Sequence, residues 1–283
     1  MSQEAYHGTS DLTSGCSPAL GTGQTLAATT RLVAAPDQYR FEGEDLGDWF
    51  AAQIQAQIDD MNANGIKFAG FLADSIFSSD GVIPNPIGFL KKAVDVVHAN
   101  GGIFIADEVQ PGFARTGDSF WGFGRHGVVP DIITTGKPMG NGIPVSGLLA
   151  KDHVLSAFSQ KIPYFNTFGG NPVAMAAAQA VLKTIQEEEL QAHSQRLGGL
   201  LLTELRKLME KYDCVGDVRG AGLFIGFELV QDRFTKMPDK ALALDLIEEL
   251  RNTHRVLTSV AGPYGNVLKL RPPLVLSLIH ISE

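Results

Sequence analysis

The sequence predicts an α/β protein, in which a three-layer, mostly parallel sheet carries helices on both faces and a smaller α+β domain follows. Two short apolar runs, 102–106 and 131–135, are bounded by glycine and charged residues, as buried parallel strands are. Helical patterns alternate with these runs, which is typical of parallel strands joined by helices. A long helical region is then followed by strands around one further helix, and this change of order predicts the second domain.

The individual elements follow from hydrophobic spacing and from residues that begin or end helices. Apolar residues recur near helical spacing over 48–64 and a glycine follows, so a helix is expected there. A second helix is expected over 86–100, because a proline begins this segment and two glycines follow it. The segment 15–47, rich in Gly, Thr, Pro and Ala, indicates an extended loop. The other expected elements are strands at 66–76, 145–150, 222–230, 256–260 and 267–270, a helical region over 172–212 broken near Gly198 and Gly199, and a helix over 239–253.

The two domains are expected to divide inside the long helical region. We place residues 1–185 in the larger domain and residues 186–275 in the smaller one. Residues 276–283, Leu-Ser-Leu-Ile-His-Ile-Ser-Glu, resemble the translation of a sequencing adapter. They are therefore expected to be a non-native tail outside the fold. A native C-terminal strand is the alternative.

Composition favours a soluble enzyme of the cytoplasm. The 283 residues, 44% of them hydrophobic, are enough for one large or two modest domains. The net charge is 23 − 31 = −8 and no basic run stands out, so nucleic acid is not an expected partner. No apolar stretch reaches membrane-spanning length, and two cysteines are too few for a disulfide framework. The seven histidines lack metal-ligand spacing, so no metal site is expected.

The chemistry is expected where the two apolar runs end. Asp107 begins the segment Asp-Glu-Val-Gln after the first run, and Lys137 follows a glycine directly after the second. In open α/β sheets, ligands lie outside the carboxyl ends of the strands, so both side chains should meet at one edge. Pyridoxal phosphate needs such a pair, because the acid keeps its pyridine nitrogen protonated and the lysine forms the Schiff base and moves the proton. A solvated lysine and a turn-forming aspartate are the structural alternative, which the Gly and Pro beside Lys137 disfavour.

A third motif predicts an anion site. Asn171 is a good N-cap and Pro172 suits the first position of the helix that follows. A helix N-terminus with flanking glycines and a hydroxyl binds anions readily, so a cofactor phosphate would fit there. An ordinary capped helix is the alternative.

Five segments together resemble one family. ADEVQPGFARTG, PDIITTGKPMGNGIP, YFNTFGGNP, VGDVRGAGLFIGFELV and LKLRPPL occur in the order that class III pyridoxal-phosphate aminotransferases show. The resemblance runs from about Glu4 to Val275 and is strongest to the branch that holds alanine–glyoxylate aminotransferases and amino-alcohol-phosphate phospho-lyases. It implies the fold type I architecture and a transaminase that moves an amino group between an amino acid or amine and a 2-oxo acid.

The resemblance also implies roles around the cofactor. Lys137 matches the Schiff-base lysine, and Asp107 matches the acid that faces the pyridine nitrogen. Gln110 matches the residue near the phenolic oxygen of the ring. Tyr6 and His7 belong to the Tyr-His-Gly motif, whose aromatic ring stacks on the cofactor.

Two further residues connect the site to its partners. Thr167 matches the hydroxyl that reaches the cofactor phosphate of the partner subunit, which implies a homodimer with shared active sites. Arg271 matches the arginine that holds a substrate carboxylate, and its planar guanidinium suits bidentate pairing. A surface ion pair is the alternative for Arg271.

The chain departs from the family pattern in two places. The segment that usually reads Glu-Pro-(Val/Ile)-Gln-Gly is here Asp74-Ser75-Ile76-Phe77-Ser78, on the substrate side, which puts the substrate in question. Tyr6 lies almost at the start, so the Gly-Ser phosphate cup that the family carries upstream is expected to be missing.

Three other functions stay open at this point. A phospho-lyase would use the same lysine but expel phosphate from a phosphorylated amino alcohol. The chain is alternatively an inactive fragment that lacks its phosphate cup. A nucleotide-binding oxidoreductase is disfavoured, because the spacing from Gly220 and Gly222 to Gly226 is wrong and a strand follows.

Overall fold

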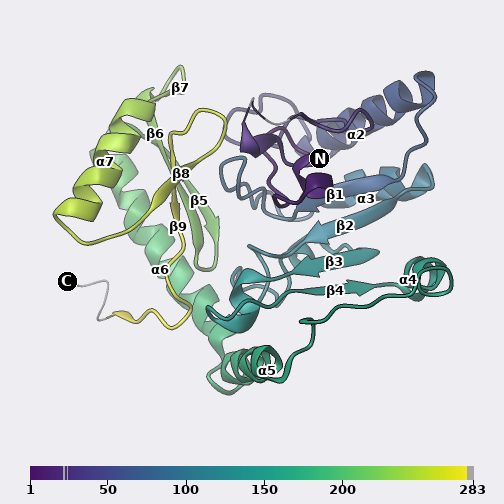
Figure 1. The fold of residues 1–283 in the computed structure, drawn as a ribbon. Helices are drawn as coiled ribbons and strands as arrows, with labels where there is room; N and C mark the ends of the chain where they lie inside the picture. Colours follow the sequence, from purple (N-terminus) through teal and green to yellow (C-terminus); the bar gives the residue numbers. More distant parts are fainter. Residues whose placement is uncertain (22, 24, 279–283) are drawn as a thin grey trace.

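The computed structural model describes residues 1–21, 23 and 25–278. Two lobes are visible in Figure 1, one built on strands β1 to β4 and the other on strands β5 to β9. No helix among these residues is long and apolar enough to cross a membrane. In chain order the elements are α1 (Asp11–Ser14), η1 (Pro18–Leu20), α2 (Leu46–Ala63), β1 (Gly70–Asp74), α3 (Leu90–Ala99), β2 (Ile103–Asp107), η2 (Gly122–His126), β3 (Ile132–Thr135), η3 (Lys137–Gly140), β4 (Gly147–Ala150), α4 (Asp152–Ser159), α5 (Pro172–Glu187), α6 (Leu190–Lys211), β5 (Val215–Ala221), β6 (Phe224–Asp232), β7 (Met237–Pro238), α7 (Lys240–Asn252), β8 (Ser259–Ala261) and β9 (Val267–Leu270).

The first sheet brings three strand ends to one edge. Its order is β1-β2-β3-β4, with the first three strands parallel and β4 antiparallel to β3. Asp74 at the end of β1 lies opposite Asp107 at the end of β2, and Asp107 lies opposite Thr134. Lys137 follows two residues after β3 ends. The fold class is therefore the predicted one, α/β with a mostly parallel sheet, and the carboxyl ends meet as expected.

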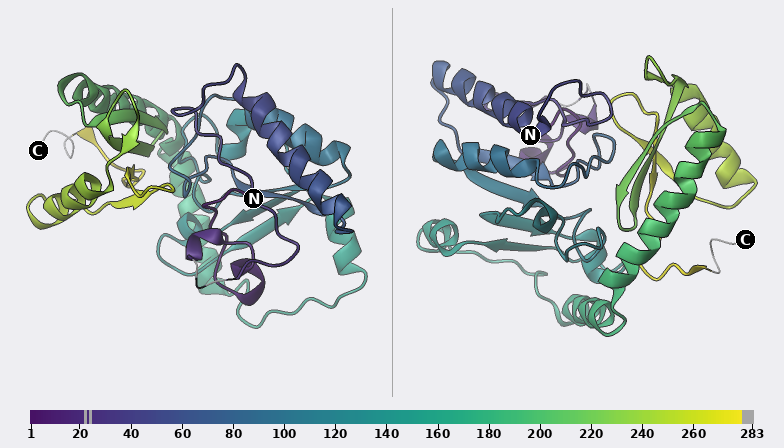
Figure 2. Two further views of the ribbon diagram at one scale, coloured as in Figure 1. Left: turned by 90° about the horizontal axis from the view of Figure 1, so that it is seen from above. Right: turned by 180° about the vertical axis from the view of Figure 1, so that it is seen from behind.

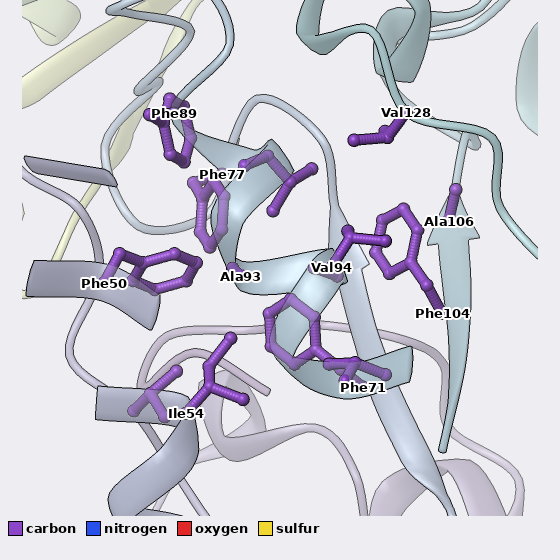
Figure 3. Packing of buried hydrophobic residues seen from close by; sticks show 14 of the residues in the cluster. Phe50, Ile54, Phe71, Phe77, Phe89, Ala93, Val94, Phe104, Ala106 and Val128 are labelled. Carbon is purple, nitrogen blue, oxygen red and sulfur yellow. The ribbon is translucent and has the colours of Figure 1, made fainter. Parts of the chain in front are cut away.

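The core of this lobe lies between the sheet and helices α2 and α3. Asp45 caps α2 by accepting a hydrogen bond from the Asp48 amide, and the apolar face of α2 places Phe50 against the sheet. Figure 3 shows Phe50, Phe71 and Phe104 in this layer, and the Phe50 and Phe71 rings meet edge to face at 6.1 Å. Burying such aromatic side chains contributes about 1.5–3 kcal/mol each, so the apolar layer holds the strand ends in place.

The second sheet is antiparallel and turns one face to the first lobe. Its order is β5-β6-β9-β8, with β7 on β6. Figure 2 shows α6 as a long helix beside this sheet, where it contacts β5 and β6. The register pairs Arg219 with Gly226 and Gly226 with Lys269, so Arg219 and Lys269 lie on one face. Gly226 lies between them and allows Val82 to pack closely, because a Cβ atom at position 226 would lie only 3.1 Å from Val82 Cβ.

Three predicted boundaries are wrong for local reasons. The long helical region breaks at Glu188 and Glu189, where Glu189 has a φ of 50°, and not at the predicted glycines inside α6. Helix α3 begins at Leu90 and not at residue 86, because Gly88 has a φ of 90°. Strand β1 ends at Asp74, whose side chain accepts from the Ile76 and Ser78 amides and turns the chain.

In the second lobe the strand predictions are partly wrong. The expected strand over 222–230 runs from Phe224 to Asp232, and the expected strand over 256–260 is shifted to Ser259–Ala261. Strands β5 and β7 of this lobe, and helices α1 and α4 earlier in the chain, were not predicted.

Residues 279–283 of the predicted tail lie outside the described residues. The division at residue 185 stays a prediction.

Candidate functional site

A cavity of about 1070 Å³ lies at the carboxyl ends of the parallel strands. Five of the residues predicted for a cofactor site line it: Tyr6, His7, Asp107, Gln110 and Lys137. Three of these lie at or just after the ends of strands β2 and β3, and two come from the N-terminal segment, which contacts the end of β2 through His7 and Asp107. The positions agree with the prediction, while the roles stay predictions.

Asp107 and His7 form a buried pair. His7 Nδ1 lies 2.7 Å from Asp107 Oδ2, and the two side chains are 4% and 12% exposed. The other Asp107 oxygen accepts from the Val109 amide at 3.1 Å. His7 Nε2 is buried and has no partner within the described residues. The carboxylate is therefore held by two donors at the wall of the cavity, where its negative charge can serve a cationic ligand atom.

Lys137 lies at the start of η3 and enters the cavity from the neighbouring strand. Its Nζ atom is 5.9 Å from the centre of the Tyr6 ring, a cation–π distance. Pro138 follows directly and cannot continue the β3 ladder, so the chain turns into η3 at this point. The lysine therefore lies in the short η3 turn directly after β3, and it is exposed.

Gln110 links this cavity to a smaller one. Its Nε2 donates to Ser78 Oγ at 2.5 Å, and its Oε1 accepts from Arg271 Nη1 at 3.0 Å. A cavity of about 250 Å³ shares Gln110 and Lys137 with the larger one and is lined by Arg271 and Phe224. The structure therefore brings the predicted carboxylate-binding arginine beside the predicted lysine.

Two cationic residues beside Arg271 were not predicted. Burial and the nearby charge of Arg271 lower the pKa of Lys269 to about 8. Lys269 lies in β9 (Val267–Leu270), and Arg271 follows directly after the strand ends; this spacing was readable in the sequence. Burial, and then Arg271, lower the pKa of Arg115 to about 10, and Arg115 also lines the smaller cavity.

Two residues from the segment that departs from the family pattern, and Asp80 just after it, lie at the site. Asp74 and Asp80 line the larger cavity, and Ser78 is fully buried behind it. Burial raises the pKa of Asp74, and burial raises the pKa of Asp80 to about 7. Asp80 accepts from Ser2 Oγ at 2.7 Å and from the Glu4 amide at 3.1 Å, and so holds the segment that carries Tyr6.

Thr167 is the predicted residue that the structure does not bring to the others. It is exposed and lines neither cavity, whereas its neighbours Phe168 and Gly170 line the larger one. The motif after it is formed as predicted, because Asn171 caps α5 by accepting from the Ala174 amide at 2.9 Å. The α5 N-terminus therefore borders the larger cavity.

The residues present fit pyridoxal phosphate. The larger cavity is of the size that cofactors occupy, and it sets a lysine amine and a carboxylate at neighbouring strand ends. Thr135 adds a buried hydroxyl that lines the cavity and has no partner within the described residues. Lys137 would hold the aldehyde carbon of the cofactor, Asp107 would face its ring nitrogen, and Tyr6 offers an aromatic face.

Two curated relatives carry names from two activities. An alanine–glyoxylate aminotransferase 2-like protein of Drosophila melanogaster is 43% identical over 240 residues, which cover 84% of this chain and 49% of the fly protein. An ethanolamine-phosphate phospho-lyase homologue of Caenorhabditis elegans is 39% identical over 239 residues, which cover 84% of this chain and 51% of the worm protein. The chain thus spans about half the length of the curated relatives it matches.

Solved structures and a family sequence model agree with these matches. An Arthrobacter phospholyase in complex with phosphoethanolamine matches with a TM-score of 0.93 and 37% identity, covering 99% of this chain and 67% of that one. A Bacillus anthracis aminotransferase matches with a TM-score of 0.90 and 30% identity, covering 99% of this chain and 66% of that one. The model for aminotransferase class-III matches residues 1–283. The chain therefore belongs to the class III aminotransferases, a family that depends on pyridoxal phosphate.

Proposed function

We propose that this chain carries the reaction centre of an aminotransferase that moves an amino group from an amino acid or amine to a 2-oxo acid. The observation that carries the proposal is the placement of Lys137 and Asp107 in one cavity, with Arg271 lining the adjoining one. A lysine, a carboxylate and a carboxylate-binding arginine are the groups that this chemistry needs from the protein. The family membership supports the same reaction.

Each residue has a distinct task in this reaction. When bound, pyridoxal phosphate supplies an electron sink for the carbon that loses a proton. Asp107, oriented by His7 Nδ1 at 2.7 Å, would keep the ring nitrogen protonated. The Lys137 amine would take the proton from the substrate carbon and return it elsewhere. Arg271 would pair with the substrate carboxylate and fix its orientation.

Chemical trapping of the cofactor on Lys137 tests the proposal. The protein is incubated with pyridoxal phosphate, reduced with borohydride, and mapped by peptide mass. We expect one stable adduct, on Lys137, and none in the Lys137→Ala variant, while Lys183→Ala, at an exposed helix position, should keep it. No adduct, or labelling spread over surface lysines, would favour an inactive fragment.

A phospho-lyase is the second candidate, because Lys269 and Arg115 both lie near Arg271 and Arg115 lines the smaller cavity with it. A phosphate monoester carries up to two negative charges, and a second cation beside Arg271 would match the second charge. A curated relative is named as a phospho-lyase homologue, and a solved Arthrobacter phospholyase is described in complex with phosphoethanolamine. Release of inorganic phosphate from a phosphorylated amino alcohol, without any added 2-oxo acid, would support this candidate. Turnover only when a 2-oxo acid is present would exclude it.

We also propose that the protein acts as a homodimer. Exposed aromatic side chains lie on both sides of Thr167, with Phe165 86% and Phe168 82% exposed, and Leu148 of β4 is 59% exposed. Apolar surface of this kind marks a protein interface, and Thr167 would then reach the partner's cofactor phosphate. Light scattering should give twice the chain mass, and a monomer that still turns over substrate would contradict the shared site.

A cytoplasmic location is a further proposal. It is supported by two free cysteines in a chain of this size, although relatives include proteins named as mitochondrial. Fluorescent tagging of the protein in its own cells would test it, and signal confined to an organelle would exclude it.

A further inference from the structure

Four side chains form a continuous line of hydrogen bonds from the end of β1 to the smaller cavity. Ser78 Oγ donates to an Asp74 oxygen. Gln110 Nε2 donates to Ser78 Oγ at 2.5 Å, and Arg271 Nη1 donates to Gln110 Oε1 at 3.0 Å. Ser78 is fully buried, so water does not replace its hydroxyl as a partner for Gln110.

The direction of every bond in this line follows from which groups can donate. Arginine only donates, so Gln110 must turn its carbonyl oxygen to Arg271 and its amino group to Ser78. Ser78 must then accept from Gln110 and use its single hydrogen on Asp74. Asp74 also accepts from the Ile76 and Ser78 amides, at 2.9 and 3.0 Å, which leaves its carboxylate fixed by the turn after β1.

One edge of the Arg271 guanidinium is therefore held by Gln110, while the other edge stays available for a ligand. The bond from Nη1 to Gln110 is its one side-chain hydrogen bond within the described part of the chain, and its guanidinium carbon lies 5.8 Å from the centre of the Phe224 ring. The Nε and Nη2 atoms on the other edge remain to receive a carboxylate in the bidentate manner. A guanidinium fixed in this way loses less rotamer entropy on binding than a free one.

We propose that Ser78 is a positioning residue that sets the preference for substrates with a carboxylate. Its hydroxyl, anchored on Asp74, orients the Gln110 amide, and Gln110 in turn holds Arg271 ready for the carboxylate. This inference rests on the proposed role of Arg271. Ser78 belongs to the segment in which the chain departs from the family pattern, and it stands where that pattern has glycine.

The affinity for a simple carboxylate gives a direct test. Propionate is titrated by calorimetry into the protein incubated with pyridoxal phosphate. Ser78→Ala should raise its dissociation constant about three- to tenfold, because one hydrogen bond in the line is lost. The same variant should raise KM for a 2-oxo acid by a similar factor and leave KM for an amine donor without a carboxylate unchanged. Equal changes for both substrates, or none, would overturn the proposal.

A double-mutant cycle separates positioning from a general structural effect. In an Arg271→Ala background, Ser78→Ala should cause no further loss of propionate affinity, since the line no longer ends on a carboxylate-binding group. An equal loss in both backgrounds would show that Ser78 acts through the fold. If the alanine variant does not fold, Ser78→Cys replaces it, because the cysteine side chain is similar in volume but is a weak hydrogen-bond acceptor. Ser78→Cys should weaken propionate binding in the same way.

Ser159 provides the control. It is an exposed serine of α4 that lines neither cavity, so Ser159→Ala should leave propionate affinity unchanged. Adduct mapping on the same samples keeps the two proposals apart. An adduct on Lys137 with no response to Ser78→Ala would refute only the inference about Ser78. A missing adduct would refute the proposed function.

Discussion

At the scale of single residues, the site depends on where each charge is placed and on what holds it. Asp107 is fixed by His7 and by the Val109 amide, and it therefore needs no side-chain rearrangement to face a cationic ring nitrogen. Lys137 lies at the next strand end, close to the Tyr6 ring. Both residues lie at or just after the ends of strands that meet at the same edge of the sheet. The register of β2 and β3 therefore brings the acid and the lysine into one cavity.

Replacing Asp107 with Asn should weaken cofactor binding and slow the reaction. The amide carries no charge to hold the ring nitrogen protonated, and the rate is expected to fall about 100-fold or more. Cofactor absorbance during titration and steady-state rates measure the two effects. Asp95→Asn, at an exposed position paired with Lys91, should change neither. An unchanged rate in the Asp107 variant would argue against the predicted contact with the ring.

The unfolding free energy should fall as the pH rises toward the pKa of Asp80. Burial raises this pKa from 3.8 to about 7, so between these values the folded protein holds a proton that the unfolded chain has released. The stability that this proton contributes is complete below about pH 4 and is lost as the pH rises through about 7.

Asp80→Asn isolates this effect, because the amide can still accept from the Glu4 amide and bond to Ser2 but does not titrate. Urea unfolding from pH 5 to pH 8 is the measurement. Relative to the variant, the wild type should lose about 1.4 kcal/mol per pH unit between pH 5 and 7. Parallel stability curves for the two proteins would show that Asp80 stays ionised in the folded state.

At the scale of elements, hydrophobic periodicity and capping residues predict where helices and strands occur. Contacts between elements decide the residues at which these elements begin and end. The two glycines expected to break the long helical region lie inside α6. Gly198 is required there by packing: a Cβ atom would lie 2.1 Å from the Gly222 carbonyl oxygen. The break occurs instead at Glu189, with a left-handed backbone that glutamate rarely adopts.

The two glycines of α6 should respond in opposite ways to alanine. Gly198→Ala should destabilise the protein by about 1–3 kcal/mol, because backbone must move to admit the methyl group. Gly199 faces open space, with no atom near its Cβ position, so Gly199→Ala should stabilise by about 0.5–1 kcal/mol through helix propensity. Urea denaturation of both variants gives the comparison. A stabilising Gly198→Ala would mean that α6 and the turn at Gly222 are not in close contact.

At the scale of the whole molecule, Arg219 ties the second sheet to the first lobe. It is 9% exposed and donates to the carbonyl oxygens of Gly81 and Val82. In its own sheet it pairs with Asp217 and Glu228 at 2.8 and 2.7 Å. The loop it holds follows Asp74 of β1 and carries Ser78 and Asp80, so the shape of the site depends on contacts between the lobes.

Arg219→Met should destabilise the protein by about 3 kcal/mol, since the buried Glu228 carboxylate then keeps Arg40 as its only ion-pair partner within the described residues. Lys207→Met removes a charge from an exposed pair with Glu204 and should cost less than about 1 kcal/mol. Thermal or urea unfolding of both variants tests this. Equal stabilities of the two variants would show that the contacts of Arg219 contribute little to holding the lobes together.

The pairing of distant strands explains which parts of the sequence could be read. The sequence predicts strands at 102–106 and 131–135, because short apolar runs between glycine and charged residues are typical of buried strands. Strand β5 was missed because Arg219 and Asp217 interrupt its apolar pattern, and the ion pairs of Arg219 with Asp217 and with Glu228 make the charged residues acceptable there. The line from Asp74 to Arg271 was not predictable, since it joins residues almost 200 positions apart.

The sequence by itself determined the fold class, the family resemblance and the identity of the candidate lysine, acid and arginine, because local pattern and residue chemistry carry that information. Tertiary structure alone decided that Ser78 contacts Gln110, that Lys269 stands beside Arg271, and that Thr167 lies apart from the other site residues. The physical reason is that these relations depend on strand register and on packing between lobes. Neither leaves a periodic signal in the chain, since each is set by contacts between residues far apart in it.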